Sequence, residues 1–392
     1  MSSPETPPAR NRDRTVIALS VVAMLVLVAL LGAGSAFALG AFTSSASPSH
    51  SDSDDEDEDE DEENEDEDDE DAAEIDGRAC VILPDSASAP RWEATDRPYF
   101  EQAFEDAGIE YDVQNAQGDE SKYASIAEEQ LDEGCGVMIL ADYNGAATQI
   151  AEDAHDQGVP VIAYDRPLFG ADYYIGYDPV EVGSLEGRSI VDGLTAAGID
   201  PAEASVVYVG GDPNDGNAQL FHDGAEAIME AAGITPAYET EGTWDGPTAG
   251  TSFAGAYTAL GGNIDAVWAA NDYNAAAVIT VLDSVGLTVP VSGQDASTAG
   301  LQNVLLGKQT GTVYKPASLE AEAAVELAIT LLSGDEPSIG SHTTDDGVPF
   351  IAISPILVGP DQVQAVVAAG DASASDICTG AVATACQAYG VG

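Results

Sequence analysis

GVMILADYNGAATQIAEDAHDQGVPVIAYDR, residues 136–166, is the stretch of this sequence that decides the fold. Its apolar run Gly136–Ala141 predicts a strand, Ala147–Ala154 has helical spacing that stops at Gly158, and Pro160–Tyr164 predicts a second strand. Two strands joined by a crossover helix form a βαβ unit, in which the strands are parallel. The stretch therefore predicts a parallel sheet with helices packed against it.

The same alternation continues on both sides of this stretch. Upstream, Ala79–Leu83 predicts a strand, and the next helical pattern stops at Gly108. Downstream, a second series of strands is separated by Ala-rich helical stretches: Ser205–Val209, Ala266–Ala270, Val289–Ser292 and Thr312–Tyr314. Two such series predict an α/β protein with two Rossmann-like, doubly wound lobes. Because ligands of such sheets bind at the carboxyl ends of the strands, we expect the site in a cleft between hinged lobes.

Basic residues are rare, so their positions carry information. The part of the chain after Gly77 has only eight Lys and Arg residues. Three of them follow predicted strands, namely Arg91, Arg166 and Lys315. Any one of the three, taken alone, could equally form an ordinary surface salt bridge, which contributes little to stability. The three together favour a binding site at the strand ends.

Polar and aromatic residues gather in the same kind of loop. They are Trp92, Asp165, Asn217, Trp244, Asn271, Asp272, Gln294 and Asp295. Carboxylate, amide and guanidinium groups can each hold two sugar hydroxyls, and an aromatic ring stacks on the apolar face of a sugar. The alternative is that the tryptophans pack in the core and the Asn and Asp residues cap helices. For Asp272 the two explanations are equally good.

The charge balance excludes one class of partner. The chain has 11 Lys and Arg against 70 Asp and Glu, a net charge of -59. Nucleic acid is therefore not expected to bind, because phosphate contacts need clustered cations.

We find no GxSxG, HExxH or GxxxxGK[ST] motif, and we expect no catalytic residue, cofactor or metal site. If the enzyme alternative held, the protein would be a glycosidase that uses two of the strand-end aspartates as its acid and base pair.

The N-terminal part predicts export to the extracytoplasmic face of the plasma membrane. Residues 1–14 form a basic cytoplasmic region, and residues 15–42 form an apolar helix that is either a signal anchor or a cleaved signal peptide. Residues 43–76 form a spacer in which 18 of the 20 residues from Asp52 to Asp71 are acidic. Such a run repels itself and is expected to be disordered.

All four cysteines, Cys80, Cys135, Cys378 and Cys386, lie in the exported part, where disulfides form. Four cysteines allow three pairings. Cys80 and Cys135 stand at the starts of two predicted strands, so they are within disulfide reach if those strands are neighbours. Cys378 and Cys386 would then close a small C-terminal loop.

Seven blocks in register resemble the D-xylose-binding branch of periplasmic (type I) sugar-binding proteins of ABC importers. They are Arg91-Trp92, Asp142–Gly145, Ala163–Pro167, Asp215–Phe221, Ala270–Asp272, Ser292–Ala296 and Thr312–Pro316, within a match from about Val81 to Leu332. The sequence departs from the family pattern after Trp244, where Asp245-Gly246-Pro247 is shortened.

The resemblance implies two lobes joined by three crossings, with the sugar at the hinge. The first lobe would take residues 77–178 and 315–344, and the second 179–314 and 345–392. Hydroxyls would be bound by Arg91, Arg166, Asn217, Asn271, Asp295 and Lys315. Trp92 and Trp244 would sandwich the ring, and Asp165 would contact the sugar or orient Arg166. A monomer that delivers a monosaccharide to a membrane permease is expected; a sugar-sensing ectodomain or chemoreceptor module of the same fold is the alternative.

Overall fold

The computed structural model describes residues 77–86, 91–344 and 346–392, which all belong to one compact unit, Glu70–Gly392. The predicted basic region 1–14, the apolar segment 15–42 and the acidic spacer 43–76 lie outside the described residues. Within the described ranges, no helix is long and apolar enough to cross a membrane.

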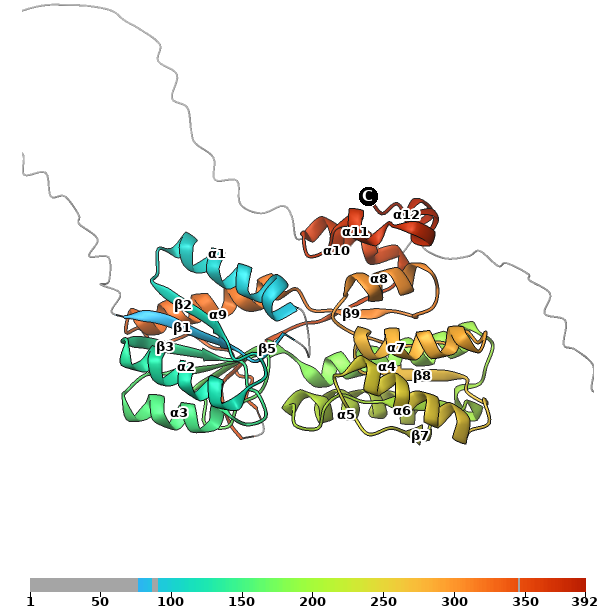
Figure 1. Ribbon diagram of the computed structural model, residues 1–392, viewed down its shortest axis with the longest axis horizontal. Helices are drawn as coiled ribbons and strands as arrows, with labels where there is room; N and C mark the ends of the chain where they lie inside the picture. Colours follow the sequence, from blue (N-terminus) through green and yellow to red (C-terminus); the bar gives the residue numbers. More distant parts are fainter. Residues whose placement is uncertain (1–76, 87–90, 345) are drawn as a thin grey trace, which may run out of the picture. The chain divides into compact units, whose positions relative to one another are not determined.

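The first lobe is built on a six-stranded sheet in which every pair is parallel, with the strand order β10-β5-β4-β3-β1-β2. The strands are β1 Arg78–Leu83, β2 Tyr111–Asn115, β3 Cys135–Leu140, β4 Val161–Tyr164, β5 Tyr173–Tyr177 and β10 Phe350–Ile353. Helices α1 (Arg97–Ala107) and α9 (Ala317–Leu332) cover one face, and α2 (Glu120–Asp132) and α3 (Ala147–Asp156) cover the other (Figure 1).

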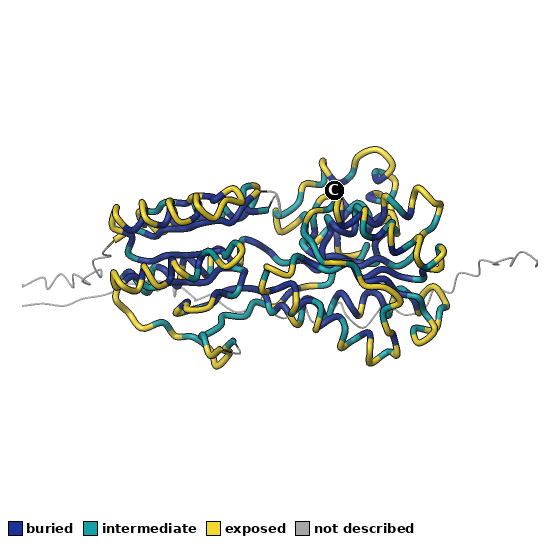
Figure 2. Tube along the Cα trace, turned by 60° about the horizontal axis from the view of Figure 1, so that its bottom comes forward, coloured by how far each residue is buried: buried dark blue, intermediate teal, exposed yellow. Residues whose placement is uncertain are grey.

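The opening stretch of the sequence has the structure that its pattern predicts. Strand β3, helix α3 and strand β4 follow one another within it, and β3 pairs with β4 in parallel. The inner strands are continuous apolar runs because helices cover both faces of the sheet. Figure 2 shows these buried strands between helices whose outer faces are exposed. The predicted α/β class is confirmed.

The second lobe has a three-stranded parallel sheet in the order β7-β6-β8. Helices α4 and α5 pack on one face of this sheet, and α6 and α7 on the other. The bounds are β6 Val206–Val209, β7 Pro236–Glu239, β8 Ala266–Ala269, α4 Pro179–Ala196, α5 Gly216–Ala231, α6 Gly246–Ala259 and α7 Asp272–Ser284. The strand predicted at Val289–Ser292 is only an isolated bridge between Val291 and Val267.

A C-terminal group of short elements packs on the second lobe. Strand β9 (Thr312–Tyr314) pairs antiparallel with β11 (Ile356–Val358), beside helix α8 (Thr298–Leu305). Helices α10 (Val363–Ala369), α11 (Ala374–Ile377) and α12 (Ala383–Tyr389) complete this core, together with the short helical turn η5 Gly380–Val382. Two further short helical turns are η4 Pro360–Gln362, which leads into α10, and η3 Pro201–Glu203, which precedes β6.

Both disulfide pairings that the sequence suggested are confirmed. Cys80 and Cys135 link β1 to its neighbour β3, and Cys378 and Cys386 close a loop in the C-terminal group. The first bond spans 55 residues and the second spans 8.

The chain crosses between the lobes three times, after Tyr177, Tyr314 and Ile353. The assignment of all residues from 345 to 392 to the second lobe is wrong, because β10 pairs in parallel with β5 of the first sheet. A run of four apolar residues between two prolines does not reveal which sheet it joins. The third crossing therefore lies between β10 and β11.

Helices α4 and α5 of the second lobe lie in unusually close contact because glycines line their crossing. A Cβ atom on Gly183 would meet the carbonyl oxygen of Phe221 at 1.9 Å, and one on Gly224 would meet that of Val180 at 2.2 Å. Since this crossing sets the position of α5, it also sets the position of the side chains at the start of that helix.

Candidate ligand-binding site

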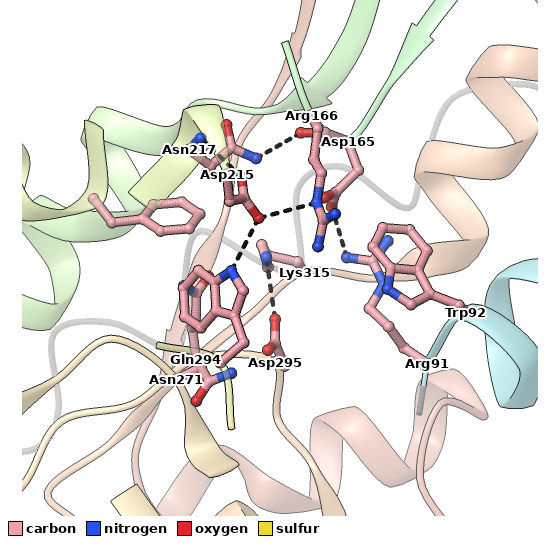
Figure 3. A pocket seen from close by; sticks show the side chains of 12 residues that line it. Arg91, Trp92, Asp165, Arg166, Asp215, Asn217, Asn271, Gln294, Asp295 and Lys315 are labelled. Atoms are coloured by element: carbon pink, nitrogen blue, oxygen red, sulfur yellow. Dashed lines mark hydrogen bonds and ion pairs between the residues drawn. The ribbon is translucent and has the colours of Figure 1, made fainter. Parts of the chain in front are cut away.

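The structure brings all nine predicted ligand-binding residues around one cavity between the lobes. They are Arg91, Trp92, Asp165, Arg166, Asn217, Trp244, Asn271, Asp295 and Lys315. Asp215, Phe221 and Gln294 complete the lining (Figure 3).

The first lobe contributes side chains from the ends of β1 and β4. Arg91 directly precedes the helical turn Trp92–Asp96 (η2), which leads into α1, and Asp165 and Arg166 follow β4. Asp165 has a left-handed backbone with φ 61, held by its N–H bond to the carbonyl of Ile175 at 2.9 Å. Non-glycine residues rarely adopt this conformation except where surrounding structure enforces it, as at binding sites.

Arg91 is held by three acidic side chains. Its guanidinium donates to Asp96 at 2.6 and 2.9 Å, to Asp165 at 2.8 Å and to Glu320 of α9 at 2.8 Å. The guanidinium carbon also lies 4.7 Å from the centre of the Trp92 ring. These contacts fix the orientation of Arg91 at the cavity wall without any ligand.

Glu320 is completely buried beneath Arg91. Burial, followed by the negative charges of Asp165 and Asp96, raises the pKa of Glu320 to about 8, and Arg91 only partly offsets this rise. We therefore expect Glu320 to hold a proton over most of the neutral range.

A Glu320→Gln variant tests this protonation. Because its pKa in the folded state lies above the ordinary value of 4.5, the proton on Glu320 stabilises the fold fully below pH 4.5 and progressively less as pH rises toward 8. We expect the wild type to lose stability relative to Glu320→Gln by about 1.4 kcal/mol per pH unit within this window. Urea unfolding at several pH values measures it, and parallel profiles for the two proteins would contradict it.

The second lobe contributes Asp215, Asn217 and Phe221 from the start of α5. Asp215 caps this helix by accepting from the Asn217 N–H at 2.9 Å, and it also accepts from Trp244 Nε1 at 3.1 Å. The Trp244 ring reaches the cavity because residue 211 is glycine: a Cβ there would lie 2.2 Å from the ring.

The remaining second-lobe residues follow β8 and precede the second crossing. Asp295, with φ 90, forms an ion pair with Lys315 at 3.1 Å. Asn271 caps α7 by accepting from the Asn274 N–H at 2.9 Å and still lines the cavity. Its neighbour Asp272 does not line the cavity; it is buried and accepts from Gln309 at 2.6 Å, and burial raises its pKa to about 7.

At the cavity, two polar contacts cross directly from one lobe to the other. Arg166 Nε lies 2.9 Å from Asp215 Oδ2, and the Asn217 side-chain amide donates to the Asp165 carbonyl at 2.7 Å (Figure 3). Closure thus places a cation of one lobe against a carboxylate of the other.

Burial by itself would raise the pKa of Asp165, but the charges of Arg91, Lys315 and Arg166 hold it below its usual value. For Asp215, burial outweighs the attraction of Arg166 and raises the pKa. The two carboxylates at this junction therefore differ in acidity because Asp165 has three cations near it and Asp215 has one.

Asp215 and Phe221 were not predicted as site residues, and Gln294 was noted among the strand-end polar residues but not among the ligand-binding ones. All three lie within blocks that carry the family resemblance. Asp215 caps helix α5, Phe221 lies more than one turn into that helix, and Gln294 forms an isolated bridge with Val313. Locally these positions indicate only a helix cap and core packing.

The lining suits a neutral ligand with many hydroxyl groups. Each of the three cations already faces a carboxylate, so the cavity offers donors and acceptors together rather than one excess charge. Trp92 and Trp244 supply aromatic surface. The three described histidines, His155, His222 and His342, do not line the cavity.

Comparison with known proteins gives a consistent result. A family model described as periplasmic binding protein domain matches residues 80–336. The D-xylose-binding periplasmic protein of Escherichia coli (strain K12) is 33% identical over 293 residues, which cover 71% of this chain and 86% of that protein. The multiple sugar-binding periplasmic protein of Azospirillum brasilense is 30% identical and covers 71% of this chain and 84% of its own length.

Solved structures agree on the fold. A carbohydrate transporter solute-binding protein from Chloroflexus aurantiacus in complex with D-glucose has a TM-score of 0.68 and 27% identity, and covers 76% of this chain and 97% of its own. A Caulobacter myo-inositol-binding protein has a TM-score of 0.65 and 23% identity, and covers 75% of this chain and 97% of its own; at that identity the likeness concerns the fold alone.

Proposed function

Because the chain belongs to the periplasmic binding protein domain family, we propose that it is the extracytoplasmic solute-binding component of an ABC sugar importer. It binds a monosaccharide, D-xylose or a close relative, between its lobes and delivers it to the permease without chemical change. The observation that carries this proposal is the convergence of all nine predicted ligand-binding residues on one cavity.

The chemistry of the cavity supports a small sugar. Arg91, Arg166, Asn217, Asn271, Asp295 and Lys315 are the hydroxyl-binding groups in this proposal. Trp92 and Trp244 hold the two faces of the ring, and Asp165 orients Arg91 and the turn before Arg166.

Closure of the lobes around the ligand couples sugar binding to recognition by the permease. A ligand that touches both lobes biases the protein toward the closed form, and the permease recognises that form. Micromolar affinity requires roughly 8 kcal/mol, which several charge-assisted hydrogen bonds and two stacking faces supply.

A calorimetric titration panel tests the sugar. We expect D-xylose to bind with a Kd in the micromolar range or below, and about tenfold or more tightly than D-ribose, L-arabinose or D-glucose, since each differs by one hydroxyl or one CH2OH group. Tryptophan fluorescence gives an independent readout, because Trp92 and Trp244 line the cavity. If none of the four sugars produced heat or a fluorescence change, the proposed function would be wrong.

Delivery places the protein as a monomer at the outer face of the membrane. In this proposal the apolar segment 15–42 is the tether and the acidic spacer 43–76 holds the lobes away from the bilayer. Deletion of the gene should abolish high-affinity uptake of the sugar, and mass spectrometry of the native N-terminus shows whether segment 15–42 is retained. Normal uptake in the deletion strain would favour a sensor in place of a transporter component.

A further inference from the structure

The carboxylate of Asp371 lies between two tyrosine hydroxyls. Tyr99 donates to Oδ1 at 2.5 Å, and Tyr314 donates to Oδ2. Tyr99 belongs to α1 of the first lobe, whereas Tyr314 ends β9 and packs in the C-terminal core of the second lobe. Asp371 follows α10 in that same core, so the hydrogen bond from Tyr99 joins the two lobes across 272 positions of the sequence.

The carboxylate is held firmly on the second lobe. Its segment is followed by the disulfide between Cys378 and Cys386, and the Gln302 amide of α8 donates to the carbonyls of Asp376 and Ile377 at 3.0 Å. The bond from Tyr314 lies within the second lobe and therefore persists whether the lobes are open or closed. Only the bond from Tyr99 depends on closure.

Tyr99 and Asp371 stand outside the proposed sugar cavity. Neither residue is among its lining. Asp371 and Tyr314 instead line a neighbouring cavity of about 310 Å³, which shares only Arg91, Asp295 and Lys315 with the sugar cavity. The Tyr99 contact can thus act on the lobes without touching the ligand.

We propose that the Tyr99–Asp371 hydrogen bond is a closure latch, which raises the population of the closed form and thereby the affinity for the ligand. Asp371 is a positioning residue in this role, not a ligand-binding one. Affinity for a ligand of the closed form falls in proportion to the population of that form, so loss of the latch weakens binding at a distance. The link to sugar affinity rests on the proposed function.

The chemistry of the contact suits a latch. A hydroxyl that donates to a carboxylate makes a charge-assisted hydrogen bond, which is stronger than one between neutral groups. Burial and then the hydrogen bond to Asp371 raise the pKa of Tyr99 to about 12, so its hydroxyl remains a donor throughout the neutral range.

Two matched variants of the full chain separate a latch from a purely structural contact. Tyr99→Phe removes the hydroxyl that crosses between the lobes, and Tyr314→Phe removes the equivalent hydroxyl within the second lobe. We expect Tyr99→Phe to weaken D-xylose binding about tenfold in calorimetry and to speed ligand release, whereas Tyr314→Phe stays near the wild-type affinity. Equal losses in both variants would overturn the proposal.

A readout without sugar makes the test independent of the ligand. Spin labels on cysteines introduced by Glu128→Cys in α2 and Ala259→Cys in α6, both exposed positions, report the separation of the lobes. We expect a shift to longer distances in unliganded Tyr99→Phe and none in Tyr314→Phe. An unchanged distribution in Tyr99→Phe overturns the latch. If the wild type bound no sugar, the proposed function would fail while these distances still decided the latch.

Discussion

Arg166→Ala is expected to weaken D-xylose binding by at least about a hundredfold. The guanidinium lines the cavity, lies 2.9 Å from Asp215 of the opposite lobe and stands 5.5 Å from the centre of the Trp92 ring. Its removal takes away a hydrogen-bond donor to the ligand. It also leaves the buried charge of Asp215 without its cation, and loss of one partner from a buried ion pair costs about 3–5 kcal/mol. Isothermal titration calorimetry measures the affinity.

An exposed arginine provides the matched control. Arg188 on α4 is exposed and does not line the cavity, so Arg188→Ala removes the same charge from the protein and should leave the affinity unchanged. Thermal unfolding of both variants shows whether the fold is retained. An affinity for Arg166→Ala within threefold of the wild type would mean that the proposed cavity is not the binding site.

Gly183→Ala is expected to destabilise the second lobe by more than about 3 kcal/mol. The added methyl group would lie 1.9 Å from the carbonyl oxygen and 2.7 Å from the carbonyl carbon of Phe221. Both are backbone atoms, so neither can rotate away, and α4 must move from α5. Because α5 carries Asp215 and Asn217 at its start, the surviving folded protein should also bind the sugar more weakly. Urea unfolding with a second-lobe probe such as Trp268 fluorescence measures the loss.

A glycine-to-alanine substitution at an open helix position should instead raise the free energy of unfolding. Gly255 lies inside α6, and a Cβ atom there would meet nothing within 4 Å. Alanine favours the helix over glycine by about 1 kcal/mol, so Gly255→Ala should stabilise the protein. A free energy of unfolding for Gly183→Ala close to that of the wild type would show that the two helices are not packed as described.

Local patterns determined most of the fold and much of the candidate site. The alternation of apolar runs with helical spacing is set by neighbouring residues, so it predicted the α/β class correctly, and the strand predicted at Pro160–Tyr164 is found at Val161–Tyr164. The predicted site residues follow strands or open helices, and the carboxyl ends of parallel strands meet at one edge. For that reason Arg91, Arg166 and Lys315 were found from their positions alone, and the structure places them around one cavity.

Contacts between distant segments were decided only by the tertiary structure. Glu320 lies under Arg91 although 229 residues separate them, Asp215 faces Arg166 across the lobes, and Asp371 meets Tyr99 across 272 residues. Strand β10 joins the first sheet through pairing with β5, which its four apolar residues do not specify. Periodicity says which side of an element is buried, but not which partner buries it. The burying partner is fixed by how the helices, sheets and lobes pack. The sequence alone therefore determined which strand ends carry the candidate site residues. Tertiary packing decided which of their charged side chains pair with one another.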